Sequence, residues 1–406
     1  MTEFTIASFN VKNLIEADHE YYKYEAYTPE EHSWKQSWLA NQMLTLNADN
    51  TCFQEIFSEK SLRDVIEETD ELGSEANAAN IPDRSKRYAR RAIFRKLAHE
   101  SYADAALAFA PNANDDGPGQ RRPGVATLSR FGFAAPPEVL QDLLEPLNIP
   151  FSDLDGSDGG YYTIKRLSRP VLKTKIPVGD IVVTVFNCHL KSKLGELDRP
   201  KGAAFAPAAD LVNYDPAGRA MGSLRAGLRR MAEAWVLRRE ILVELEAGNP
   251  VMVLGDMNDS EHAVSSEIIS GETPFKNYAW MRRHDAAHKG DRYKDTENEA
   301  IQAQIDRVRL YSAEKMFVRK SARDMIYTSA FGGVFESIDQ ILMSRHFNQG
   351  DPEAIGEMTY FNVLNDHLTD GSHPDAPYNK LVSDHGQIMA HVVLNDAQKL
   401  GNLQNC

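Results

Sequence analysis

The sequence predicts a large α/β protein, because segments with the apolar pattern of strands alternate with segments whose apolar residues recur at helical spacing. Several of the strand-like segments end in a polar residue, most clearly at residues 251–259, Val-Met-Val-Leu-Gly-Asp-Met-Asn-Asp. Asp256 and Asn258 are two residues apart on an extended chain, so their side chains point the same way. Ligands of α/β sheets gather beyond the carboxyl ends of strands, which makes this a candidate site. The alternative is an acid that only stabilises a turn.

The N-terminal half of the chain contains three expected strands and three expected helices. We expect strands at residues 3–9, 50–55 and 125–128, helices at 34–46, 59–72 and 83–109, and a loop at 111–123. Residues 34–46 carry two tryptophans, two leucines and a methionine at helical spacing. The loop is rich in Gly, Pro, Asn and Asp, which favour turns.

The C-terminal half follows the same alternation with longer loops. We expect strands at 181–186, 251–254, 337–342 and 386–394, a helix at 223–247, and polar loops at 194–221, 260–335 and 348–380. The helix has a continuous apolar stripe and is followed by Gly248, a typical helix cap. The pattern predicts one large α/β domain over residues 1–395 and a tail at 396–406.

Composition narrows the class of protein. The chain has 406 residues, 42% of them apolar, and no apolar run of about 18 residues, so we expect no membrane span. Its net charge of −14 argues mildly against a general nucleic-acid-binding protein. Three cysteines do not form a disulfide framework, and the N-terminus lacks the pattern of a signal peptide. We therefore predict a cytoplasmic protein.

Two features invite a functional interpretation that we do not favour. Cys188 precedes His189, but adjacent strand residues point to opposite faces, so this histidine is poorly placed to activate the thiol. We expect a buried, inert cysteine. The basic run at residues 84–96 contains few aromatic residues, and we interpret it as a solvated helix face rather than a nucleic-acid patch.

Polar residues stand at six expected strand ends that are far apart in the sequence. They are Asn10, Glu55, Asn187 with His189, Asp256 with Asn258, Asp339, and Asp384 with His385. The sequence has no cluster of cysteines and histidines with the spacing of a zinc site. It also has neither the Gly-x-x-x-x-Gly-Lys motif of a phosphate-binding loop nor the Gly-x-Ser-x-Gly motif of a serine nucleophile. Oxygen ligands with few nitrogens suit Mg²⁺ or Mn²⁺, and such an ion can polarise a phosphoryl oxygen.

Seven short motifs occur in an order that resembles the endonuclease/exonuclease/phosphatase superfamily. They are Ser-Phe-Asn-Val-Lys-Asn-Leu at 8–14, Phe-Gln-Glu at 53–55, Leu-Ser-Arg at 128–130, Asn-Cys-His-Leu-Lys-Ser at 187–192, Gly-Asp-Met-Asn-Asp at 255–259, Ser-Ile-Asp-Gln-Ile-Leu at 337–342 and Ser-Asp-His at 383–385. The resemblance implies a four-layer α/β sandwich with two facing mixed β-sheets flanked by helices. It also implies a metal-dependent phosphoesterase with its site at one edge of the sheets.

The resemblance also implies roles for these residues. Glu55 would be the principal metal ligand, helped by Asn10 and by Asp384. Asp256 would orient or deprotonate the attacking water, and Asn258 would donate to a phosphoryl oxygen. His385 would contact the phosphoryl group or assist proton transfer, with Asp339 fixing its tautomer. The choice of Asp256 or His385 as the base stays open, and so does the number of metal ions.

Four further residues are candidates for the phosphate side of the site. His189 matches a phosphate-binding position of the family, although a lone strand histidine is more often a core residue. Asn187 lies on the same strand face, and Lys191 follows. Arg122 resembles an arginine that precedes a strand in a bacterial branch of the family, with extra residues at 117–121 altering its spacing.

The sequence therefore predicts a hydrolase that uses Mg²⁺ or Mn²⁺ to cleave a phosphoester, with a phosphodiester favoured. A DNA or RNA nuclease is the first alternative, and a catalytically inactive binding module on the same fold is the second. The substrate and the oligomeric state are not indicated. Residues 365–367, Asn-Asp-His, either reach the site or form a surface turn.

Overall fold

The computed structural model describes residues 2–22, 25–78, 98–112, 122–150, 160–195, 216–273, 295–318, 326–370 and 379–395. Two six-stranded mixed sheets form its centre. The first has the order β13-β14-β1-β2-β4-β3 and the second the order β5-β6-β7-β8-β12-β9. Within them β1 pairs with β2, and β7 with β8, in parallel, and the other neighbours are antiparallel.

The elements have the following bounds. The first sheet contains β1 (Glu3–Leu14), β2 (Asn50–Ile56), β3 (Ala106–Asn112), β4 (Arg122–Ser129), β13 (Gly356–Leu364) and β14 (Gln387–Leu394). The second contains β5 (Glu138–Pro150), β6 (Tyr161–Val178), β7 (Ile181–His189), β8 (Val251–Asp256), β9 (Leu310–Ser312) and β12 (Asp339–Ser344). The helices are α1 (Pro29–Leu46), α2 (Glu59–Ala78), α3 (Pro216–Glu246), α4 (Val264–Ser270), α6 (Asp295–Val308), α7 (Ala313–Val318) and the short η3 (Arg345–Phe347). A small separate hairpin joins β10 (Ser329–Phe331) and β11 (Val334–Glu336).

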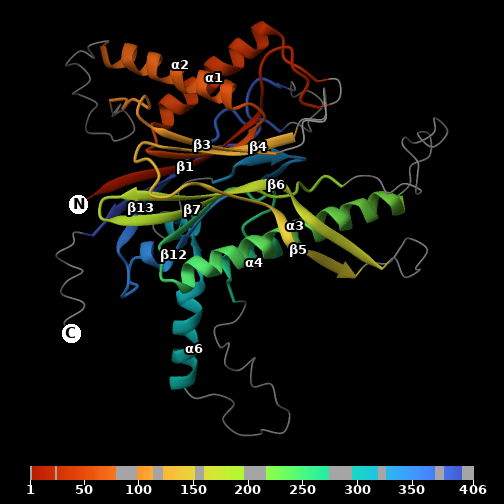
Figure 1. The fold of residues 1–406 in the computed structure, drawn as a ribbon, viewed down its shortest axis with the longest axis vertical. Helices are drawn as coiled ribbons and strands as arrows, with labels where there is room; N and C mark the ends of the chain where they lie inside the picture. The colour runs from red at the N-terminus through yellow and green to blue at the C-terminus, as the bar shows by residue number, and fades with distance from the viewer. Residues whose placement is uncertain are drawn as a thin grey trace.

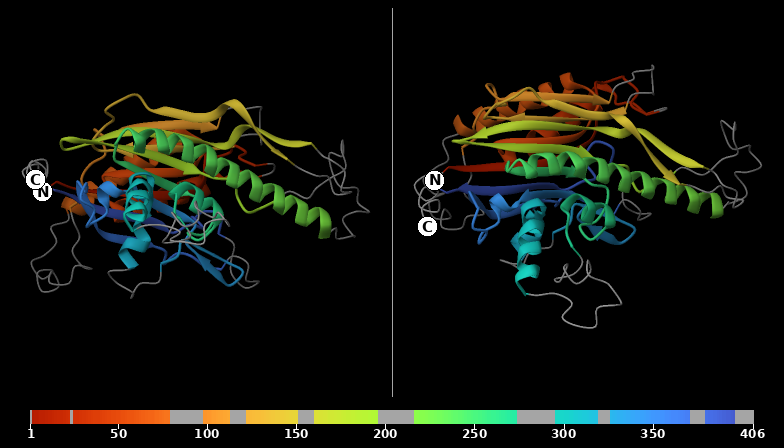
Figure 2. Two further views of the ribbon diagram at one scale, coloured as in Figure 1. Left: turned by 90° about the horizontal axis from the view of Figure 1, so that it is seen from below. Right: turned by 60° about the horizontal axis from the view of Figure 1, so that its bottom comes forward.

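The two sheets face each other, and helices cover their outer faces (Figure 1). Between the sheets, Phe4 and Ile6 of β1 share one apolar cluster with Met252 and Leu254 of β8. Alternate residues of the same strands, such as Phe9 of β1, pack instead beneath α1 and α2, while α3 and α4 cover the second sheet. The predicted four-layer α/β sandwich is confirmed. Figure 2 shows α3 lying along the second sheet and α6 projecting from it.

The first helix begins earlier than its apolar pattern predicts. Thr28 caps it, since its side chain accepts a hydrogen bond from the Glu31 N–H while the Glu31 carboxylate accepts one from the Thr28 N–H. Pro29 occupies the first turn, where its missing N–H costs nothing. The polar residues at 29–33 therefore extend the helix without contributing to the core.

Several predicted elements are wrong or incomplete. Residues 106–109, predicted to be helical, belong to β3, and residues 98–105 contain no helix. The long strands β5 and β6 were not predicted, nor were the helices and strands within 260–335 and 348–380. The basic run at 84–96, residues 196–215 and the tail lie outside the described residues. In the part of the chain that the structure describes, no helix is long and apolar enough to cross a membrane.

A buried lysine of α1 ties the end of β1 to the segment before β14. Lys35 is fully buried, and its Nζ donates to the carbonyls of Val11 at 3.0 Å and Leu381 at 3.4 Å. Burial, together with the nearby positive charge of Lys12, lowers the pKa of Lys35 to about 7. The lysine therefore stabilises this junction at the cost of desolvating its own charge.

The depressed pKa of Lys35 predicts a pH-dependent stability. Between about pH 7 and 10.5 the unfolded chain keeps the lysine proton and the folded protein releases it, so stability rises with pH across that window. The free energy of unfolding of the native protein should rise relative to that of Lys35→Met by up to about 1.4 kcal/mol per pH unit. Urea denaturation at pH 7, 8 and 9 measures this difference.

The control for this prediction is Lys60→Met, which removes an exposed lysine of α2 that pairs with Asp64. We expect no comparable pH-dependent difference for it in the same window. A constant stability difference between native protein and Lys35→Met would contradict the proposed titration.

Candidate active site

Three of the predicted residues meet at the carboxyl end of β8. Asp256 is the register partner of His189 on β7 and of Asp339 on β12. Along β8, Met252 and Leu254 face the interior between the sheets, and alternation places Asp256 on the same face. The site therefore lies at the edge of the sandwich, where the hydrophobic core between the sheets ends.

The backbone next to Asp256 requires a glycine. Gly255 has a φ of +140°, and a Cβ at that position would lie 1.8 Å from the Cys188 carbonyl oxygen. Glycine therefore allows β7 and β8 to approach closely at their ends. This close approach brings His189 beside Asp256.

The Asp256 carboxylate is buried and surrounded by hydrogen-bond donors. Its Oδ1 accepts the backbone N–H of Asn258 at 2.7 Å. Its Oδ2 lies 3.2 Å from Asn10 Nδ2, 3.1 Å from Asn258 Nδ2, 3.2 Å from His189 Nε2 and 3.8 Å from His385 Nε2. The residue is only 1% exposed. Burial alone would raise its pKa, but His385, His189 and the Asn258 N–H together hold the pKa well below its ordinary value. Asp256 is thus a buried carboxylate that stays ionised.

Asn10 joins Asp256 to Glu55. Its Nδ2 lies 3.3 Å from Glu55 Oε1 and 3.4 Å from His385 Nε2, in addition to its contact with Asp256. Two carboxylates that share one hydrogen-bond donor cannot lie further apart than their two distances combined. Glu55 and Asp256 are therefore close enough to act on one ligand, although they come from different sheets.

Glu55 reaches Asn10 because the backbone of β2 is irregular. Alternation from Phe53, which packs beneath the helices, would point Glu55 away from the space between the sheets. Glu55 instead has a φ of 65°, and the pairing of β2 with β4 shifts register at this residue. The left-handed conformation turns the carboxylate so that Oε1 faces Asn10 and Oε2 accepts the Asn13 N–H.

His385 and Asp339 form a hydrogen-bonded pair. His385 Nδ1 lies 2.9 Å from Asp339 Oδ2, so its Nε2 faces Asn10 and Asp256. Burial would lower the pKa of His385, but the charges of Asp339 and Asp256 outweigh it and raise that pKa well above its ordinary value. Burial raises the pKa of Asp339 to about 6, which leaves it ionised at neutral pH. The expected arrangement is thus an imidazolium between two carboxylates.

The position of His385 is fixed by the end of β1. Ser383 Oγ donates to the Asn10 carbonyl at 2.6 Å and accepts the His385 N–H at 3.0 Å. His367, in the segment that the sequence left open, has its Nε2 3.0 Å from the His385 carbonyl oxygen. Residues 365–367 therefore reach the backbone of the site.

The grouping of possible metal ligands differs from the predicted one. Among the described residues, the side chains of Asp256, Asp339 and His385 offer ligand atoms within 4.8 Å of one another. Glu55 lies beside this group, because the Asn10 side chain contacts both Glu55 and Asp256. Asp384 is 64% exposed and lies 3.7 Å from Lys12 Nζ, outside the group. Carboxylate oxygens from Glu55 and Asp256 are the donor type that Mg²⁺ and Mn²⁺ prefer, so these residues fit such an ion.

Asn10 would join such a ligand set only after a rotation. Its NH₂ group faces the carboxylates, while its Oδ1 accepts the Lys12 N–H at 3.0 Å. Turning the amide over would present Oδ1 to a cation and would break the bond from Lys12. We conclude that in this structure Asn10 positions Glu55 and Asp256 through its NH₂ group and does not present its oxygen as a metal ligand.

The other predicted residues differ in how they relate to the site. Asn258 has a φ of 53°, and its Nδ2 lies 3.0 Å from the Leu190 carbonyl oxygen as well as near Asp256. His189 is 3% exposed, and burial and the charge of Arg169 lower its pKa, so it is neutral beside Asp256.

Asn187 is fully buried between the sheets, where it forms hydrogen bonds with Gln54 and with the Phe53 and Ala126 carbonyls. It supports the strands beneath the site.

Two predicted substrate-binding residues make no contact with this group of side chains among the described interactions. Lys191 Nζ donates to Ser192 Oγ and to the Leu194 carbonyl, and its backbone N–H donates to Glu233. Arg122 is exposed at the start of β4 and is paired in register with Asn112. Neither side chain forms a hydrogen bond or ion pair with Asp256 in the described part of the chain.

Arg169 of β6 is a cation at the site that the sequence did not reveal. Its Nη1 donates to the Leu190 carbonyl at 3.1 Å, the same oxygen that Asn258 Nδ2 contacts. Its positive charge lowers the pKa of His189. No motif marked this residue, because β6 itself was not predicted. Only the assignment of a strand antiparallel to β7 could have placed it here.

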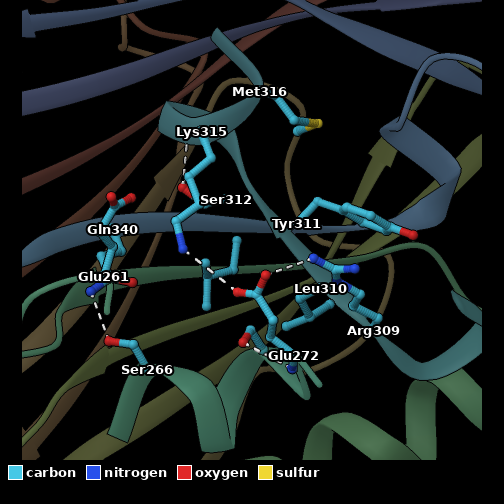
Figure 3. Close-up of a pocket in the computed structure, with 12 residues that line it drawn as sticks. Glu261, Ser266, Glu272, Arg309, Leu310, Tyr311, Ser312, Lys315, Met316 and Gln340 are labelled. Atoms are coloured by element: carbon cyan, nitrogen blue, oxygen red, sulfur yellow. Dashed lines mark hydrogen bonds and ion pairs between the residues drawn. The ribbon is translucent and has the colours of Figure 1, made fainter. Parts of the chain in front are cut away.

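A separate pocket lies on the outer side of the second sheet (Figure 3). Arg309 and Lys315 point toward Glu272 there, at 2.9 and 3.6 Å. Gln340 also lines it, although its neighbour Asp339 faces the active group on the opposite side of the strand. The cavity holds about 30 Å³, room for about one or two waters, so it is too small for a substrate.

Solved structures described as endonuclease/exonuclease/phosphatase family proteins are similar to this chain over nearly its whole length. One from Leptotrichia buccalis is 12% identical, with a TM-score of 0.45 and 96% of this chain and 100% of the other covered. One from Bacteroides thetaiotaomicron is 14% identical, with a TM-score of 0.45 and 97% and 98% covered. A mannosyl-6-phosphatase from the same organism is 12% identical, with a TM-score of 0.44 and 96% and 100% covered.

The first two of these structures carry the name of the superfamily that the sequence motifs resemble. No protein-family model and no curated protein matches the sequence. With identities this low and TM-scores below 0.5, the activity of this chain rests on its own side chains.

The His385–Asp339 pair predicts a titration that can be measured directly. Asp339→Asn keeps the shape of the side chain and removes its charge, so the pKa of His385 should fall by at least about one unit. NMR titration of the histidine ring in the metal-free protein measures the pKa. Asp384→Asn, which removes a more exposed charge, is the control and should lower the pKa less. An unchanged pKa in Asp339→Asn would show that the pair does not set the charge of His385.

Proposed function

We propose that this protein is a divalent-metal-dependent phosphoester hydrolase, and that it favours phosphodiesters. The observation that carries the proposal is the ionised, buried carboxylate of Asp256, held beside Glu55 and His385 at an edge of the sandwich. Holding a charge out of water is costly, and pKa values shifted this strongly cluster at functional sites.

Glu55 and Asp256 would hold Mg²⁺ or Mn²⁺, with Asp339 and Asn10 close by. A bound divalent ion supplies Lewis-acid chemistry, polarising a phosphoryl oxygen and neutralising charge on the leaving group. The carboxylates contributed by the two sheets would also repel one another less once a cation lies between them.

The charges of the site favour Asp256 over His385 as the group that orients the attacking water, because Asp256 is ionised and can accept a hydrogen bond from it. His385 is already protonated at neutral pH, so it is suited to donate a hydrogen bond or a proton and not to remove one. Its Nε2 faces the space beside Asp256, where it would stabilise a phosphoryl oxygen or protonate a leaving oxygen. Asp339 acts through His385 as a positioning residue, because it accepts the Nδ1–H and fixes the ring.

The phosphate would be bound mainly by Arg169 and the neighbouring polar groups. A guanidinium can bind two phosphate oxygens in a fork, and Arg169 lies close to both His189 and Leu190 at the end of β7. Asn258 would donate an N–H to a phosphoryl oxygen by exchanging its bond with the Leu190 carbonyl. Such preplaced donors stabilise charge that develops during the reaction.

Attack by water fits the described side chains better than a covalent enzyme intermediate. Cys188 is buried, as the sequence predicted, and its Sγ contacts the Leu254 carbonyl and Met257. Burial and the nearby charge of Asp256 raise the pKa of its thiol, which makes it a poor nucleophile. Ser383 uses its hydroxyl proton on the Asn10 carbonyl.

The test is hydrolysis of bis(p-nitrophenyl) phosphate with Mn²⁺, compared with EDTA-treated protein. Glu55→Gln and Asp256→Asn should both keep the fold and lose most of the activity, because each removes a negative charge while preserving shape. The matched control is Glu59→Gln, which changes a half-exposed acid of α2 that pairs with Arg63 and should leave the rate unchanged.

Two outcomes would contradict the proposal. If Asp256→Asn keeps more than about a tenth of the native rate, a barrier change of only about 1.4 kcal/mol, its role is wrong. If the native protein hydrolyses no phosphoester with Mg²⁺ or Mn²⁺, a binding module on this fold becomes the better explanation.

A nuclease is the second candidate, favoured by several arginines on β6 and on the first half of α3. Most of these have protein partners. Arg229 pairs with Glu233, and Arg230 pairs with Asp259, which leaves fewer cations for a nucleic-acid backbone. This pairing supports a small substrate over a polymer.

Salt dependence separates a small substrate from a nucleic acid. A nuclease that neutralises six or more phosphates should lose affinity by about a thousandfold or more between 50 and 200 mM salt. We expect KM for a small phosphodiester to change by less than about threefold over the same range. Steady-state kinetics with a dinucleotide and with a long single strand, at several NaCl concentrations, measures both. The nuclease would be favoured if the affinity for the long strand fell steeply with added salt and if kcat/KM at low salt were much higher for the long strand than for the dinucleotide.

A further inference from the structure

An aromatic cluster follows the end of β1 and lies next to the residues of the active site. Tyr21 stacks on Tyr27 with ring centroids 5.1 Å apart and an interplanar angle of 22°. Phe57 lies 6.0 Å from Tyr21 and 5.8 Å from Tyr22, edge-on in both cases. Tyr21 and Tyr27 are 1% exposed, whereas Tyr22 is 41% exposed. Tyr22 is therefore the member of the cluster that presents its ring to solvent.

The cluster is attached to the strands that carry Asn10 and Glu55. Phe57 is two residues beyond Glu55, and its N–H donates to the Leu14 carbonyl at 2.9 Å. The Tyr27 hydroxyl lies 3.5 Å from the carbonyl oxygens of both Lys12 and Lys380. Phe57 and Tyr27 are thus attached to the same backbone that positions the carboxylates.

Tyr22 lies near the end of β2, because its ring contacts Phe57, which is two residues beyond Glu55. Partial burial, followed by the charge of Glu55, raises the pKa of its hydroxyl to about 12, while Arg169 acts in the opposite sense and Asp384 adds to the rise. Glu55, Arg169 and Asp384 come from three separate segments. The signs of these effects agree with a position of the ring near the site.

Packing alone explains the buried members of the cluster but not Tyr22. Tyr21, Tyr27 and Phe57, joined by Ile15 and Leu381, form a closed apolar group. Tyr22 adds to this group mainly by its edge contacts and leaves much of its surface in water, next to the strand end that carries Glu55. A planar, partly exposed ring in that position is suited to stack against another planar ring.

We propose that Tyr22, supported by Phe57, is a stacking surface for a planar aromatic group carried on the phosphoester substrate. The proposal rests on the phosphoester hydrolase function and adds the substrate class, namely esters in which the phosphate lies within reach of an aromatic ring or a nucleobase. The phosphate would lie at Asp256 and Arg169 while the ring lies against Tyr22. A rigid tyrosine loses little conformational freedom when it makes such a contact.

The test compares two ligands that differ only in the ring. AMP and ribose 5-phosphate carry the same sugar phosphate, and only AMP has a planar base. Isothermal titration calorimetry with the Mn²⁺-loaded full chain measures both dissociation constants. The native protein should bind AMP at least tenfold more tightly than ribose 5-phosphate.

Three variants assign this preference to Tyr22. Tyr22→Leu should remove most of the preference for AMP while changing the affinity for ribose 5-phosphate less than twofold. Tyr22→Phe keeps the ring and should keep the preference. The control is Tyr360→Leu, which replaces a similarly exposed tyrosine of β13 that packs on Phe317. This variant should bind both ligands as the native protein does.

The failure of this proposal is distinguishable from failure of the hydrolase. If AMP binds no more tightly than ribose 5-phosphate, or if Tyr22→Leu keeps the preference, while Mn²⁺-dependent hydrolysis of bis(p-nitrophenyl) phosphate persists, the stacking surface is wrong and the hydrolase stands. If no phosphoester is hydrolysed, both proposals fall.

Discussion

The structure of the site depends on keeping one carboxylate ionised out of water. Asp256 is 1% exposed, and an isolated charge at that position would be prohibitively costly. The cost is offset because donors converge on it from β1, β7 and the turn after β8, and because His385 adds a positive charge from the segment before β14. Those contributors belong to both sheets. The two sheets must therefore be packed in one relative position for the charge to be tolerated, so the fold and the site specify each other.

Much of this arrangement was predictable because strand residues alternate. The apolar residues at 252 and 254 face the interior, so the acid at 256 must follow them, and the same count places Asn10 after Phe4 and Ile6 and Asp339 before Ile341. Alternation fails for Glu55, whose left-handed backbone reverses its direction, and no residue pattern indicates such a φ in a glutamate. The motif resemblance groups Glu55 with Asn10 as metal ligands, and the structure places the two side chains 3.3 Å apart. The reason that Glu55 points there is visible only in the structure.

The rest could not be predicted, because it depends on contacts between segments with little pattern. Strands β5 and β6 pair irregularly, with register shifts between Leu140 and Leu147, and their mixed polar composition concealed them. Arg169 is placed at the site only because β6 lies beside β7. The aromatic residues at 21, 22 and 27 have no strand or helix spacing, so their stacking follows from how the chain folds back after β1. Asn187 was predicted to bind the phosphate side of the substrate, yet its side chain forms hydrogen bonds between the two sheets.

The backbone conformations near Asp256 show where the fold gives up stability. Of six non-glycine residues with positive φ in the described part of the chain, four are Lys12, Asn13, Glu55 and Asn258, all next to the site. Such conformations cost about 1–3 kcal/mol each and persist only where their surroundings hold them. The contacts that do so here are specific: Lys35 and Ser383 bind the backbone of β1, the Asn13 N–H binds Glu55, and the Asn258 N–H binds Asp256. A relaxed backbone would separate Glu55 from Asn10, so the strain is what holds carboxylates from both sheets close enough to share one ligand.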